Sequence, residues 1–78
     1  MNKYYPLYLY LSRIEGNYVK LSVSEIEHII SNNLPASASK YRAWWADDKT
    51  HVQAIAWMNA GWKVKNVKLG EYVEFMRQ

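Results

Sequence analysis

Two aspartates and a histidine stand close together ahead of a helical stretch, and they are the first residues of this chain that could do chemistry. Asp47, Asp48 and His51 could supply an acid–base pair or part of a metal site. No other His and no Cys lies near them, and the chain has neither a glycine-rich phosphate loop nor a nucleophile elbow. Aspartates just before a helix are also favoured by its dipole. We therefore expect a non-enzymatic protein with no catalytic residue, metal or cofactor.

Basic and amide side chains around the same helical stretch indicate a second chemistry, nucleic-acid binding. An amide such as that of Gln53 can pair with an adenine edge in the major groove, while lysines meet phosphates. Residues 40–68 hold six basic and two acidic side chains, a net charge of +4. DNA is the expected partner. The predicted contact residues are Lys40, Arg42, Lys49, Gln53, Trp57, Lys63, Lys65 and Lys68.

The tryptophans offer an alternative, a groove for a protein partner. All four lie between Tyr41 and Val64, and rings at that density build either a core or a recognition surface. Small residues at 36–39 leave room for an incoming side chain. If all four rings are buried, the binding surface loses its aromatic anchor. The predicted groove residues are Ser37, Ser39, Trp44, Trp45 and His51.

Composition bounds the class of protein. The 78 residues, half of them hydrophobic, predict a single domain spanning 1–78 with a net charge of +3. A core of that size supplies only about 3–5 kcal/mol, so the tryptophans matter to the fold. The absence of cysteine rules out a disulfide framework and a zinc finger. We read no signal peptide and no membrane span, and expect a cytoplasmic location and no membrane partner.

The first element is predicted as a helix. Pro6 suits a first helical turn, apolar residues recur at helical spacing over 7–14, and Gly16 ends the run. The alternation within 7–11 also suits a strand, and that alternative stays open.

A short strand and a second helix follow. Residues 18–21 have strand propensity, and the helix begins with one of two overlapping capping boxes. Ser22 with Glu25 forms one, and Ser24 with Glu27 forms the other.

The second half predicts a third helix and a hairpin. A short helical segment is expected at 36–42, and Thr50 with Gln53 forms a capping box for a helix that ends at Gly61. Residues 62–76 alternate as a β-hairpin with lysines on one face and an irregularity at Asn66. The predicted fold is α+β and winged-helix-like, with three helices, a short N-terminal strand and a C-terminal hairpin.

Four short motifs carry a resemblance to a known family. Residues 34–38 read LPASA, 44–48 read WWADD, 51–57 read HVQAIAW and 60–64 read AGWKV. They resemble the LPxSA, WWxND, HxQAxAW and AGWxV signature of a small bacterial domain of unknown function, and the match covers nearly the whole chain. The chain departs from the signature at Asp47, where the family more often has Asn, which argues against an amide-mediated contact there. The resemblance implies the family and no activity.

Overall fold

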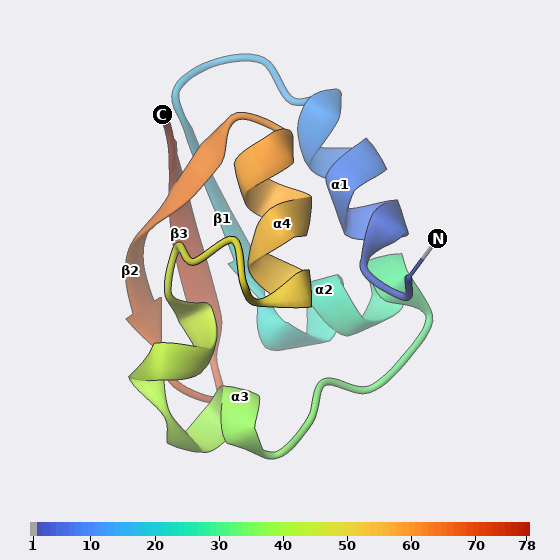
Figure 1. The fold of residues 1–78 in the computed structure, drawn as a ribbon, viewed down its shortest axis with the longest axis vertical. Coiled ribbons are helices and arrows are strands. Elements are labelled where there is room, and N and C mark those ends of the chain that lie inside the picture. The colour runs from blue at the N-terminus through green and yellow to red at the C-terminus, as the bar shows by residue number, and fades with distance from the viewer. Residues whose placement is uncertain (1) are drawn as a thin grey trace.

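Helices cover one face of a three-stranded antiparallel sheet in the computed structural model, which describes residues 2–78 (Figure 1). The elements in chain order are α1 (Tyr5–Ser12), β1 (Tyr18–Ser22), α2 (Val23–Ile30), α3 (Ser37–Lys40), the 3-10 helix η1 (Arg42–Trp45), α4 (Val52–Asn59), β2 (Trp62–Lys68) and β3 (Tyr72–Arg77). The strands lie to one side, α4 occupies the centre, and α1 lies beyond α4 (Figure 1). This architecture confirms the predicted α+β class.

The helices differ from the prediction in number. The described residues form four α-helices and one 3-10 helix, where the sequence predicts three helices. The additional elements come from the short helical segment expected before the paired tryptophans. Tyr41 has an extended backbone, with φ −125° and ψ 123°, and it divides that segment into α3 and η1. The first element is a helix with Pro6 in its first turn, so the strand alternative is wrong.

Of the three predicted capping boxes, one is formed. Ser22 and Glu25 make a complete box at the start of α2, whereas the carboxylate of Glu27 accepts a hydrogen bond from the backbone of Leu34 instead. The predicted box at α4 is wrong, because His51 is its N-cap and provides no side-chain cap.

The sheet has the order β1-β3-β2, so the first strand pairs with the last. Both pairings are antiparallel, and Val19 and Val64 lie opposite Phe75 from either side. The register shifts between Val64 and Asn66, which makes Lys65 an extra residue in β2 and confirms the predicted irregularity. One sheet face is buried under the helices and the other is open.

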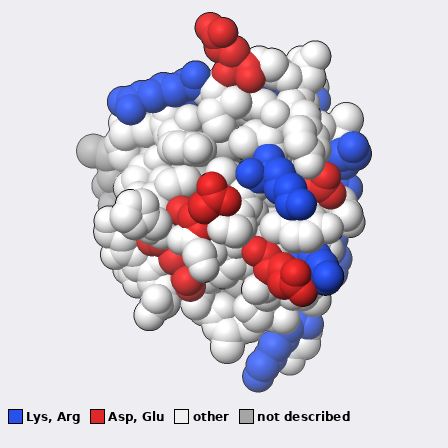
Figure 2. Space-filling model, turned by 180° about the vertical axis from the view of Figure 1, so that it is seen from behind, with Lys and Arg blue, Asp and Glu red and all other residues white. Residues whose placement is uncertain are grey.

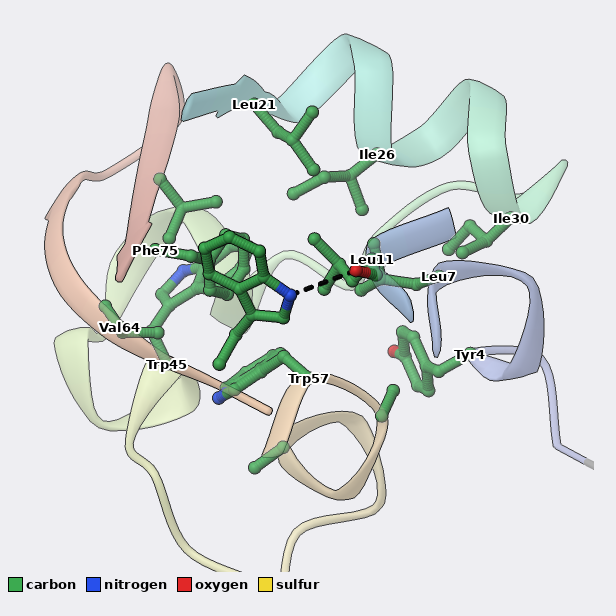
Figure 3. Close-up of a cluster of buried hydrophobic side chains, with 14 of the residues drawn as sticks. Tyr4, Leu7, Leu11, Leu21, Ile26, Ile30, Trp45, Trp57, Val64 and Phe75 are labelled. Carbon is green, nitrogen blue, oxygen red and sulfur yellow. Dashed lines mark hydrogen bonds between the residues drawn. The ribbon is translucent and has the colours of Figure 1, made fainter. Parts of the chain in front are cut away.

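Three tryptophans build the core between sheet and helices (Figure 3). Trp45, Trp57 and Trp62 are at most 1% exposed, and the first two stack with ring centroids 5.8 Å apart. Each indole N–H has an acceptor: Ala38 O for Trp45, Asp47 Oδ1 for Trp57 and Leu11 O for Trp62. These hydrogen bonds offset the free-energy cost of removing the indole N–H groups from water, so the rings can be buried.

Candidate nucleic-acid interface

The open face of the sheet carries alternating basic and aromatic side chains. The buried positions of the strands face the helices, so the intervening residues point to solvent. Lys63 and Lys68 project from β2, Lys20 projects from β1, and Tyr72 projects from β3 between them. No charged side chain of β2 faces the core, which agrees with the prediction that the hairpin carries its lysines on one face.

Two tyrosine rings hold neighbouring lysines in place on this face. The Lys20 ammonium lies 4.0 Å from the centroid of the Tyr72 ring, and the Lys65 ammonium lies 5.4 Å from that of Tyr18. The ring of Tyr72 is therefore covered by a cation. A nucleic acid would therefore meet the positive charges of these lysines rather than uncovered aromatic rings on which its bases could stack.

One acidic residue interrupts the basic face. Glu74, on the central strand, accepts hydrogen bonds from the Tyr18 hydroxyl and from Asn66 Nδ2. The bond from Tyr18 has the largest effect in lowering the pKa of the Glu74 carboxyl below its usual range. The bond from Asn66 and the nearby charges of Lys65 and Lys20 lower it further. The bond between Tyr18 and Glu74 also raises the pKa of the Tyr18 phenol. An ionised carboxylate at the centre of the sheet repels phosphate and lowers the net positive charge of this face.

The exposed basic residues of β2, together with those of the neighbouring α3 and η1, form the set that we call the basic strip. Gly70 in the hairpin turn lies beside α3, since a Cβ added there would be 3.9 Å from the Ser39 side chain. The 3-10 helix η1 also contacts β2. Lys68 is partly neutralised by Glu71, whose carboxylate lies 3.3 Å from its ammonium in an exposed pair. The basic strip consists of Lys40, Arg42, Lys63, Lys65 and Lys68.

The face of the molecule seen from behind Figure 1 has a mixed charge distribution (Figure 2). Figure 2 shows the described acidic side chains spread over the middle of that view, with basic side chains mostly towards one side and the margins. Charges of both signs next to one another give a phosphate backbone little net attraction. The basic strip is therefore the more suitable surface for a polyanion.

The loop before α4 is held by its aspartates. Asp47 Oδ1 accepts hydrogen bonds from Trp57 Nε1 at 2.8 Å and from the backbone N–H of Val64 at 3.0 Å. The second bond occupies part of the free edge of β2. Asp48 accepts hydrogen bonds from the hydroxyl and from the backbone N–H of Thr50, and these bonds lower the pKa of its carboxyl. The sequence does not reveal the role of Asp47, because both of its donors are distant along the chain.

The structure corrects the expectation that α4 presents Gln53 and Trp57 to a nucleic acid. Gln53 is 8% exposed and its Nε2 donates to the carbonyl of Trp44, while Trp57 is fully buried. Both side chains belong to the interior, because α4 lies between the sheet and α1. Lys49 is exposed in the loop held by Asp47.

The predicted partner groove is filled by the chain itself. Trp45 occupies the space that the small residues of α3 leave, and its indole N–H bonds the carbonyl of Ala38. Trp44 is half-buried and packs edge-on against Tyr4 and Trp45. Ser37 and His51 are half-buried and Ser39 is exposed beside the hairpin turn. The structure brings Trp44 and Trp45 together beside α3, but Trp45 is not available as a wall.

Within residues 2–78, no three side chains of the His, Cys, Asp and Glu types gather in an arrangement that could hold a metal ion. No helix in the same range has the length and apolar character needed to cross a bilayer.

One comparison with known proteins gives a match. A family model described as "Domain of unknown function (DUF7662)" matches residues 4–78. No curated protein and no solved structure matches the chain.

Proposed function

This chain belongs to the DUF7662 family of domains of unknown function, and we propose that it is a small non-enzymatic domain that binds nucleic acid, DNA in the first instance, weakly through the basic strip. The observation that carries the proposal is the outward projection of the β2 lysines next to α3 and η1. Such a surface attracts phosphates by charge and releases counterions on binding.

We also propose that the fold is winged-helix-like. The order of helix, strand, helix, helix and two strands supports this interpretation, as does a sheet in which the first strand pairs with the last. The β2–β3 hairpin then corresponds to the wing. The connection between α2 and α4 is long and contains α3 and η1, which departs from a simple helix-turn-helix.

The burial of α4 sets the expected mode of binding. A recognition helix must offer side chains to the major groove, and Gln53 and Trp57 are turned inward. Contacts from the wing to the phosphate backbone position a protein and carry no direct sequence information. We therefore propose binding with little base preference and a strong dependence on salt.

Fluorescence anisotropy with a labelled random duplex at several salt concentrations tests this function. If roughly four cations meet phosphates, the log of the association constant falls with log salt at a slope of about −3 to −4. The double variant Lys63→Gln/Lys65→Gln is expected to reduce the magnitude of that slope by about two. Its matched control is Lys3→Gln/Arg13→Gln, which removes the same charge away from the basic strip.

Equal losses in the two double variants would mean that net charge alone drives binding. No detectable binding at low salt would refute the proposed function for this domain.

A protein adaptor is the second candidate. The predicted tryptophan groove no longer supports it, because Trp45 is in the core. Its remaining support is a different surface, the uncharged outer side of α1.

A further inference from the structure

The open face of the sheet has one acidic side chain on its central strand, and hydrogen-bond donors from both neighbouring strands surround it. Glu74 of β3 lies opposite Lys20 of β1 on one side and Asn66 of β2 on the other. The Tyr18 hydroxyl donates to its Oε2, and Asn66 Nδ2 donates to its Oε1 at 3.2 Å. Both oxygens of the carboxylate are thus engaged by the protein itself.

Two lysines approach this carboxylate from opposite edges of the sheet. Lys20 comes from β1 and Lys65 from the irregular part of β2, and the charge of each favours the ionised form of Glu74. Their ammonium groups lie over the rings of Tyr72 on β3 and Tyr18 on β1, so both side chains lean towards the central strand. Ammonium, hydroxyl and amide donors around one point are the groups that bind phosphate oxygens in nucleic-acid complexes.

We propose that Glu74 takes the place that a phosphate group would otherwise occupy between Lys20 and the lysines of β2, and so confines nucleic acid to the basic strip. A phosphate over the central strand would meet a carboxylate of the same sign, and that repulsion opposes its binding. A carboxylate fixed at the site also competes with phosphate for the same donors at a high effective concentration. This role of Glu74 rests on the proposed function, and it gives a reason why the binding is weak.

Glu74→Gln tests the role because the amide removes the charge and keeps an acceptor oxygen. In the anisotropy titration with the random duplex, it is expected to raise the association constant about two- to fivefold at low salt, the effect of an exposed charge pair. The salt slope is expected to steepen by about one, because Lys20 then meets a phosphate. Glu15→Gln is the matched control. It removes the same charge from an exposed position in the loop between α1 and β1, and it is expected to leave the slope unchanged.

Lys20→Gln identifies the cation that the first variant recruits. In the wild type it is expected to change duplex affinity little, because Lys20 lies outside the basic strip. Combined with Glu74→Gln, it is expected to reverse the gain in both affinity and slope. Lys63→Gln is the matched control, since Lys63 belongs to the basic strip and lies opposite Met76 instead of Glu74. It is expected to reduce affinity by the same factor in both backgrounds.

A gain from Glu15→Gln equal to that from Glu74→Gln would overturn this role, because net charge alone would then explain it. So would a loss from Lys20→Gln that is the same in both backgrounds. In either case the wild type still binds the duplex, and the proposed function stands. If neither the wild type nor Glu74→Gln binds the duplex at low salt, the proposed function fails and the role of Glu74 fails with it. Far-ultraviolet circular dichroism of each variant verifies that the chain remains folded.

Discussion

Replacing Asp47 with alanine should destabilise the protein severely even though this side chain lies at the surface. Its carboxylate accepts from the fully buried indole of Trp57 and from the backbone of Val64 in β2. Each donor left without an acceptor costs about 1–3 kcal/mol. Water can enter part of the vacated space, because Asp47 is exposed, so we expect a loss of about 2–4 kcal/mol.

That loss is comparable to the roughly 3–5 kcal/mol that a core of this size supplies. Urea unfolding followed by tryptophan fluorescence and far-ultraviolet circular dichroism measures it. With a denaturant slope of about 1 kcal/mol/M, the midpoint of Asp47→Ala should fall by about 2 M or more.

Asp47→Asn is the matched control, because the amide keeps an acceptor oxygen and removes only the charge. It should cost less than about 1 kcal/mol. The reasoning fails if Asn is as damaging as Ala, which would make the charge the important property. It fails too if Ala costs less than about 0.5 kcal/mol, a value typical of an unremarkable surface position.

Three further variants have defined outcomes. Gln53→Ala should lower the unfolding free energy by about 1–2 kcal/mol, since the carbonyl of Trp44 loses its donor, and should leave duplex affinity in the anisotropy titration unchanged. Ser22→Ala should cost about 1 kcal/mol in urea unfolding by removing the α2 cap. Bonds from Ser22 lower the pKa of the Glu25 carboxyl from 4.5, so the stabilisation by Glu25 is present above that pH and is lost as pH falls through the folded-state value. The difference in melting temperature between wild type and Glu25→Ala should therefore shrink on acidification, and a constant difference would contradict the capping role.

Local signals in the sequence were sufficient for the elements whose causes are local. Pro6 fixes the start of α1, Ser22 and Glu25 cap α2, and the alternation of residues 62–76 predicts the hairpin with its irregularity. The capping box predicted from the spacing of Thr50 and Gln53 is not formed. Thr50 bonds Asp48 instead, and Gln53 bonds the carbonyl of Trp44. A side chain that bonds a carbonyl nine residues away leaves no local signature.

In the candidate site too, some features could be predicted from local sequence and others could not. The lysines of β2 are predicted to point outward because strand alternation fixes their side of the sheet. Whether Trp45 and Trp57 form core or surface depends on which distant segments supply acceptors for their N–H groups. Spacing along the chain carries no information on that.

The pairing of β1 with β3 has a consequence for how the protein is made. The Tyr18 hydroxyl reaches the Glu74 carboxylate across 56 residues, and within residues 2–78 β1 pairs with no strand but β3. During translation β1 emerges long before β3, and until then Leu21 has no sheet to join. Contacts of such separation slow folding and prolong the exposure of apolar surface. The nascent chain is therefore most vulnerable to aggregation and proteolysis until β3 has left the ribosome.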